Sequence, residues 1–137
     1  MESEDIYTDL ILDLNRHPQN HGELECPHLR LAGGNPTCGD EVKFDLVMKD
    51  GVIDEIKFSG HGCSISRAAE SLLTTMVKGK SVEAALSLTS GDILGELGNI
   101  VQLRMKCALL GLHVLNTGLR KFKESGEELT EIRGIRI

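Results

Sequence analysis

The sequence is poor in aromatic residues and in proline, and it has no long apolar run. It contains three Phe, one Tyr and no Trp among 137 residues, so aliphatic side chains must build the core. No stretch approaches the roughly 20 apolar residues that cross a bilayer, and we expect no contact with a membrane. Basic residues are in the minority, with a net charge of −6, which argues against a nucleic-acid partner.

The N-terminal residues also lack the features of a targeting segment. Residues 1–5 are mostly acidic, whereas a secretory signal begins with a basic region. We therefore expect a cytoplasmic protein in a reducing compartment, where its four cysteines are more often metal ligands or catalytic groups than disulfides. The length predicts a single domain over residues 1–137, with a charged, loosely packed tail from about residue 124.

Hydrophobic periodicity predicts strands in the first half of the chain and helices in the second, after one N-terminal helix. Alternating apolar residues predict strands near residues 29–31, 42–48 and 52–58. The Asp50-Gly51 pair is typical of a hairpin turn. Spacing of three and four predicts helices over about residues 4–16, 65–76, 81–86, 92–97 and 100–122. This order indicates an α+β fold in which helices cover a small antiparallel sheet.

Three cysteines stand where the predicted elements begin or end. Cys38 comes just before a strand, Cys63 lies where the second hairpin strand gives way to a helix, and Cys107 lies near the start of the last helix. Strand ends and helix starts can converge at one end of a small α+β domain. Thiolates are the soft ligands that iron–sulfur clusters and zinc prefer, so this placement predicts a metal site.

The surroundings of two of these cysteines are expected to favour the thiolate. Cys63 would lie at the N-terminus of a helix, whose dipole stabilises an anion. Arg104 and Lys106 come shortly before Cys107, and their charge would lower the pKa of its thiol.

Asp40, two residues after Cys38, is the fourth candidate ligand. A permanent cluster normally has four thiolates. A carboxylate oxygen is a harder and more exchangeable ligand for iron. Such a ligand is a defect in an electron carrier, and it is useful in a protein that must give its cluster away.

The residues alone leave other interpretations open. A lone cysteine is most often a small buried hydrophobe, which is our expectation for Cys26. Cys38 and Asp40 could belong to an ordinary turn, and we expect His61 to be an exposed loop residue. A metal-free redox or peroxide-handling thiol protein is a further alternative, although no C-x-x-C pair supports it. Composition and periodicity therefore indicate a metal or thiol site in a small α+β domain.

Taken together, the cysteine segments resemble the IscU/SufU-type iron–sulfur cluster assembly scaffolds, which are related to the N-terminal part of NifU. The resemblance covers about residues 5–123. Residues 35–40, 60–66 and 106–110 are similar to the family's three ligand segments, and Tyr7 with residues 17–22 is similar to its N-terminal helix and the turn that follows. The family fold implies a three-stranded antiparallel sheet packed with about five helices, the N-terminal helix first.

The resemblance implies that Cys38, Asp40, Cys63 and Cys107 hold a [2Fe–2S] cluster, with conversion to [4Fe–4S] as a possible later step. It implies a cysteine desulfurase, an iron donor and apo iron–sulfur acceptor proteins as partners, and a homodimer is possible. The protein would be a carrier rather than an enzyme. We expect Cys107 to accept the sulfur, because basic neighbours help to hold a thiolate and a helix start can present it outward.

The sequence mixes features of the IscU and SufU types, which leaves a second function open. IscU-type members carry His before the third cysteine, where this sequence has Lys106, the SufU-like residue. SufU-type members carry an insertion that is missing between Cys63 and Cys107. The alternative is a zinc-dependent sulfurtransferase, in which Zn²⁺ occupies the same site and Cys38 or Cys107 accepts persulfide sulfur from the desulfurase.

Overall fold

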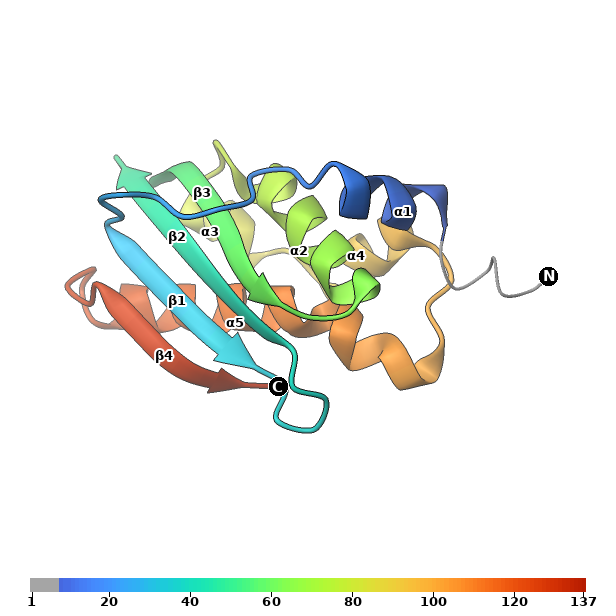
Figure 1. Cartoon of the computed structure of the whole chain (residues 1–137). Helices are drawn as coiled ribbons and strands as arrows, with labels where there is room; N and C mark the ends of the chain where they lie inside the picture. Colours follow the sequence, from blue (N-terminus) through green and yellow to red (C-terminus); the bar gives the residue numbers. More distant parts are fainter. Residues whose placement is uncertain (1–7) are drawn as a thin grey trace.

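The computed structural model describes residues 8–137, which form helices packed on one face of a sheet (Figure 1). The elements in chain order are α1 (Asp9–Arg16), β1 (Leu29–Gly34), β2 (Glu41–Lys49), β3 (Val52–His61), α2 (Ser64–Val77), α3 (Val82–Leu86), α4 (Ser90–Leu97), the 3-10 helix η2 (Gln102–Arg104), α5 (Met105–Glu124) and β4 (Glu131–Arg136). The α+β class and the five α-helices, with the N-terminal helix first, are confirmed.

The sheet has four strands in the order β3-β2-β1-β4. β2 pairs antiparallel with β1 and with β3, and the turn between β2 and β3 has the positive φ angles expected of an Asp-Gly hairpin, 54° at Asp50 and 77° at Gly51. β4 runs parallel to β1. The expectation of a three-stranded antiparallel sheet is therefore wrong, because a fourth strand makes the sheet mixed.

The fourth strand comes from the segment that we expected to be a loosely packed tail. Ile132 and Ile135 are 7% and 5% exposed, and β4 lies along β1 at the edge of the sheet (Figure 1). The alternation typical of a strand is missing from this segment, because the pairing with β1 shifts between its two isoleucines and Gly134 has a φ of 75°. A bulge of this kind places the two buried residues three positions apart along the strand, where a regular strand would place them two apart.

Two helices, α2 and α5, cover the sheet and close the core. The strands bury alternate residues such as Val42, Phe44 and Leu46 against them. Gly118 lets α5 approach β1, since a Cβ there would lie 2.6 Å from a methyl carbon of Leu31. In the part of the chain that the structure describes, no helix is long and apolar enough to cross a membrane.

The N-terminal helix is shorter than predicted within the described residues. Thr8 caps α1 through a hydrogen bond from the Ile11 amide, while Tyr7 and the predicted helical residues 4–7 lie outside the described part of the chain. α1 is tied to the start of α2, because the Asn15 side chain donates to the Ser64 carbonyl over 2.9 Å. This contact fixes one side of the region in which Cys63 lies.

Candidate metal centre

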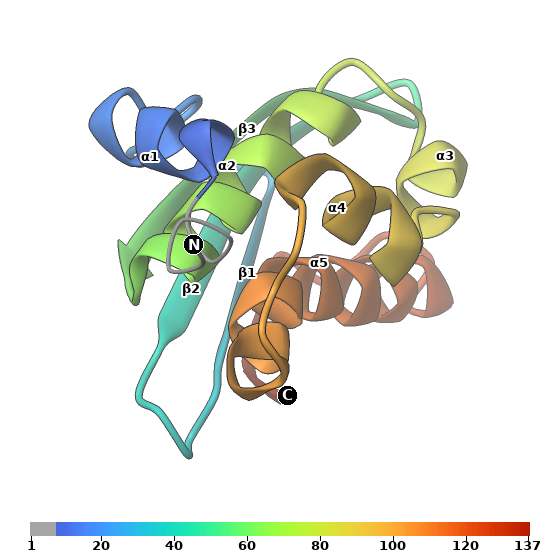
Figure 2. The ribbon, with the colours of Figure 1, turned by 90° about the vertical axis from the view of Figure 1, so that its right-hand side faces the viewer.

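Three chain segments that are distant in sequence meet at one end of the molecule. They are the loop between β1 and β2, the start of α2 and the start of α5, and Figure 2 looks onto this end. Cys38 lies in the loop, Cys63 is the N-cap residue of α2 and Cys107 is the third residue of α5. The predicted positions of these cysteines at element ends are confirmed.

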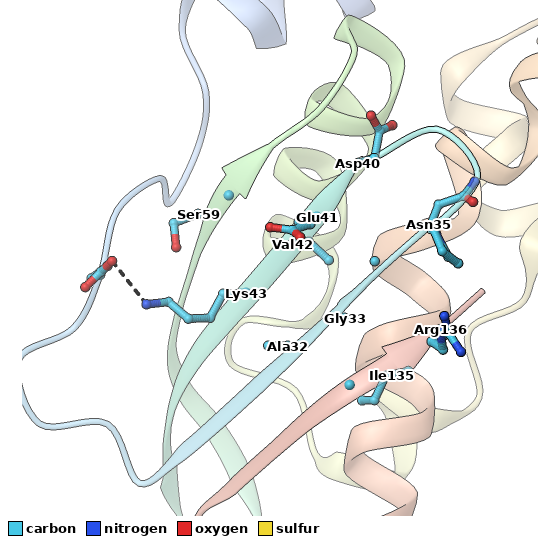
Figure 3. Close-up of a pocket in the computed structure, with 16 residues that line it drawn as sticks. Ala32, Gly33, Asn35, Asp40, Glu41, Val42, Lys43, Ser59, Ile135 and Arg136 are labelled. Atoms are coloured by element: carbon cyan, nitrogen blue, oxygen red, sulfur yellow. Dashed lines mark hydrogen bonds and ion pairs between the residues drawn. The ribbon is translucent and has the colours of Figure 1, made fainter.

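The loop between β1 and β2 is closed by hydrogen bonds across its base. The Asn35 amide donates to the Asp40 carbonyl over 2.9 Å, and the Gly39 amide donates to the Asn35 carbonyl over 2.8 Å. The Asn35 side-chain oxygen also accepts from the Thr37 amide. Figure 3 shows Asn35 and Asp40 at the two ends of the loop. The result is an exposed Cys38 near the tip and a buried Asp40 at the base.

The side chains of Cys38, Asp40 and Cys107 form a cluster. One ligand atom from each residue lies within 4.8 Å of the other two. Asp40 is 7% exposed, and its Oδ2 atom is buried without a hydrogen-bond partner among the described residues. An unpaired buried carboxylate oxygen is costly, and a bound cation would satisfy it. The donor set of thiols and one carboxylate therefore fits a metal ion or an iron–sulfur cluster.

Cys63 is not part of this group of three residues, whose ligand atoms lie within 4.8 Å of one another. It is close enough to Cys107 to raise the pKa of that thiol, so all four predicted ligands are gathered at one end of the fold. Gly62, just before it, provides the room that Asp40 needs, because a Cβ at that position would lie 3.1 Å from the Asp40 Cγ. The placement of Cys63 follows from its role as helix N-cap, where the chain turns from β3 into α2.

The Cys107 thiol is not in the environment that we expected. Burial and the neighbouring Cys63 raise the pKa of Cys107 to about 12, although a hydrogen bond with Arg104 acts in the opposite direction. The side chain is 4% exposed. The expectation of an outward-facing thiolate is therefore wrong, since burial outweighs the nearby positive charge. A bound metal ion would replace the thiol proton.

Two other cysteine and histidine predictions have different outcomes. Cys26 is exposed, so the expectation of a small buried residue is wrong. It precedes β1, whereas the cluster lies beyond the other end of that strand. His61 is exposed as expected, with its Nδ1 4.0 Å from the Glu41 carboxylate.

The sequence reasoning missed a buried carboxyl group near the cluster. Glu70 on α2 is 3% exposed, and burial followed by the charge of Asp40 raises its pKa well above the ordinary value of 4.5. Its spacing of seven residues from Cys63, about two helical turns, was the available signal.

A groove of about 790 Å³ runs along the open face of the sheet and ends at the β1–β2 loop (Figure 3). Its lining includes Asp40, Lys43 and Arg136, and it contains none of the four cysteines. The groove therefore opens beside the cluster and does not contain it.

Comparison with known proteins gives one consistent result. Residues 6–128 match the family model described as the NifU-like N terminal domain. The chain is 36% identical over 118 residues to the iron–sulfur cluster assembly scaffold protein IscU of Aquifex aeolicus, covering 85% of this chain and 75% of that protein. It is 33% identical over 134 residues to the zinc-dependent sulfurtransferase SufU of Bacillus subtilis, covering 85% and 90%.

The fold agrees with a solved structure of similar length. The crystal structure of FiSufU from Fervidobacterium islandicum AW-1 superposes with a TM-score of 0.72 at 28% identity, covering 85% of this chain and 98% of that one. The chain therefore belongs to the family of NifU-like N-terminal domains, as its three cysteine segments had predicted.

Proposed function

We propose that this protein is a scaffold on which an iron–sulfur cluster is assembled and from which it is transferred. Sulfur would come from a cysteine desulfurase, iron from a donor, and a labile [2Fe–2S] cluster would pass to apo-proteins. The observation that carries the proposal is the meeting of Cys38, Asp40 and Cys107 within 4.8 Å, with Cys63 close enough to raise the pKa of Cys107. Relatives named as assembly scaffolds support it.

Asp40 is the ligand that makes the cluster transferable. Three thiolates bind iron strongly, whereas the carboxylate oxygen is harder and exchanges more readily. Cys38, on the same loop, is exposed. One side of the cluster would therefore be held by a surface loop through a strong and a weak ligand. The other side would be held by the half-buried Cys63 at the start of α2 and the buried Cys107 near the start of α5. We infer that an acceptor protein draws the cluster out from the loop side.

Exposure favours Cys38 over Cys107 as the first sulfur acceptor. Transfer of a persulfide sulfur requires the attacking thiolate to reach the sulfur atom held by the desulfurase. Cys38 is exposed at the loop, whereas Cys107 is buried. Our earlier expectation of Cys107 rested on an outward-facing thiolate, so we now propose that sulfur arrives at Cys38 and reaches Cys107 later.

A zinc-dependent sulfurtransferase is the second candidate function. The similarity to a relative with that name favours it, as does the exposed Lys106 next to Cys107. Zn²⁺ accepts the same thiolate and carboxylate ligands. Under this function Cys38 would exchange from the metal to accept sulfur, and the protein would pass on sulfur without building a cluster.

Anaerobic purification followed by reconstitution tests both candidates. The full chain would be incubated with Fe²⁺, cysteine and a desulfurase, and the visible spectrum, iron and acid-labile sulfide would be measured together. Charge-transfer bands with about two iron and two sulfide per site support the scaffold. A colourless protein that retains one zinc, refuses iron and stimulates the desulfurase supports the sulfurtransferase. Cys26→Ser is the matched control for Cys38→Ser, because Cys26 is exposed at the other end of β1.

A further inference from the structure

The fold brings the sulfur atoms of Cys38 and Cys107 close together, although the two residues are far apart in the sequence. The Sγ atoms lie within 4.8 Å of each other. A disulfide joins two sulfur atoms about 2.05 Å apart, so the two must approach by at most about 3 Å to form this bond. Two thiols at this distance can react with each other as well as with a metal ion.

The loop that carries Cys38 can supply this movement. Cys38 is exposed near the tip of the β1–β2 loop, whose base is closed by the hydrogen bond from the Asn35 amide to the Asp40 carbonyl. At Gly39, next to it, no described atom lies within 4 Å of the position that a Cβ would take. The tip can therefore shift without displacing packed groups, whereas Cys107 is held by burial as the third residue of α5.

The two thiols differ in their access to solvent in the way that a redox pair requires. An oxidation-sensitive cysteine is accessible and has a second, resolving cysteine beside it. Cys38 is exposed and Cys107 is buried, so an oxidant in solution meets Cys38 first. Cys63 is half-buried and is not part of the group within 4.8 Å. Cys26 precedes the opposite end of β1. The geometry therefore selects one pair among the four cysteines.

We propose that Cys38 and Cys107 form a reversible disulfide when the metal-free protein meets a hydroperoxide. The Cys38 sulfur attacks one peroxide oxygen, the O–O bond breaks, and Cys38 becomes a sulfenic acid while the other oxygen leaves as water (or as an alcohol). The Cys107 sulfur then attacks the Cys38 sulfur. The S–O bond breaks, and the hydroxyl group leaves with the Cys107 proton as a second molecule of water. The two thiols are oxidised and the peroxide is reduced, with two electrons passing between them.

The disulfide would remove two of the four ligands from the site. It would also block Cys38, the proposed sulfur acceptor, so that an oxidised scaffold accepts neither sulfur nor metal. A dithiol would restore both thiols by exchange and become a disulfide itself. A metal ion already bound to the two sulfur atoms would prevent the reaction and confine it to the empty protein. This consequence rests on the proposed function, whereas formation of the bond rests only on the position of the two cysteines.

Peptide mapping identifies the bond directly. The full chain would be reduced, freed of metal and treated with one equivalent of hydrogen peroxide, and the remaining thiols would be alkylated before digestion without reductant. Trypsin cleaves after lysine and arginine and places the four cysteines on separate peptides, residues 17–30, 31–43, 58–67 and 107–120. Dimedone, which traps sulfenic acids, would be added in a parallel sample. Cys38→Ser changes an exposed side chain and tests the pair without disturbing the core, and Cys26→Ser is the matched control.

We expect peptides 31–43 and 107–120 to be joined as the main product, with a loss of about two free thiols per chain. Cys26→Ser should give the same product, Cys38→Ser should leave Cys107 reduced, and Zn²⁺ added before the peroxide should prevent the link. A main product that joins Cys63 to either cysteine, or one that joins two chains through Cys26, would overturn the inference. So would a sulfenic or sulfinic acid that persists on Cys38 in the natural protein.

Zinc binding separates this inference from the proposed function. The reduced chain should take Zn²⁺ from a coloured chelator, the linked chain should not, and dithiothreitol should restore the binding. A linked chain that binds Zn²⁺ as the reduced chain does would contradict the blocking effect of the disulfide. A reduced chain that binds neither Zn²⁺ nor iron would count against the proposed function, while the mapped bond between Cys38 and Cys107 would still stand.

Discussion

Gly62 lies so close to Asp40 that a methyl group at Gly62 would press against the Asp40 side chain. A Cβ at Gly62 would lie 3.1 Å from the Asp40 Cγ and 2.4 Å from the Ser66 Oγ. Asp40 belongs to the β1–β2 loop, while Gly62 follows β3. The glycine therefore sets how closely the loop that carries two ligands approaches the helix that carries the third.

We expect Gly62→Ala to misplace Asp40. Overpacking at this contact should lower the free energy of unfolding by about 1–3 kcal/mol, and metal affinity should fall as well. Gly95→Ala on α4 is the control, because its Cβ would meet no atom within 4 Å and an exposed helical alanine should add about 0.5–1 kcal/mol. Chemical denaturation and metal competition measure the two effects. A variant with natural metal affinity would show that this close approach does not control the site.

Asp40→Ala should lengthen the lifetime of the reconstituted cluster by about tenfold and slow its transfer. The physical reason is that the exchangeable oxygen ligand gives an acceptor thiol its first point of attack. The decay of the visible charge-transfer band and the appearance of holo-acceptor measure lifetime and transfer. Equal or faster transfer from the variant would contradict this role of Asp40.

Thiol alkylation should follow the exposure of the four cysteines. In the metal-free protein, Cys26 and Cys38 are exposed and should react first, Cys63 should follow, and the buried Cys107 should react last. Added Zn²⁺ should protect Cys38 from alkylation and leave Cys26 reactive, because Cys38 lies in the ligand cluster and Cys26 does not. Mass spectrometry of the alkylated peptides gives each rate. Protection of Cys26 together with Cys38 would indicate a different set of ligands.

The C-terminal strand should contribute to the stability of the whole fold. Ile135 is 5% exposed and pairs with Gly33 of β1, so Ile135→Ala should cost about 2 kcal/mol. Arg133→Ala on the same strand should change stability by less than about 0.5 kcal/mol, because Arg133 is exposed. Denaturant unfolding compares the two. Equal stability of both variants would mean that β4 is dispensable for the packing.

The stability of the metal-free protein should depend on pH through Glu70. The raised pKa means that the folded state keeps this proton above pH 4.5, where the unfolded state has lost it. The unfolding free energy should therefore fall as pH rises from 4.5 toward the raised value. Asp40, Cys63 and Arg67 act on the same group, so the relevant quantity is the difference between the natural protein and Glu70→Gln. A difference that does not vary with pH would contradict the raised pKa.

The sequence was sufficient to predict those elements whose structure depends on residues close together in the chain. The alternation around Phe44 and the Asp50-Gly51 pair predicted the β2–β3 hairpin, because side-chain period and turn chemistry act over a few residues. The helical spacing from Ile65 predicted α2, and the cysteines were placed correctly at element ends. These predictions needed no knowledge of which elements become neighbours.

Tertiary structure decided the features that depend on contacts between distant segments. β4 was missed because a bulge removes its alternation and its stability comes from pairing with β1. The pKa of Cys107 was expected to be low from its charged neighbours in sequence, but burial against Cys63 raises it.

The sequence by itself determined the class of the fold and which residues are candidate ligands, because periodicity and ligand chemistry depend on residue types and their spacing along the chain. Only the tertiary structure decided which thiol is accessible and which side chains meet. Glu70 illustrates the difference, since nothing in its neighbourhood along the chain indicates that α5 presents Gly111 to it and that Asp40 acts on it from another loop. Burial and the packing of distant segments are properties of the folded chain, and they set the charge, exposure and pairing of each ligand.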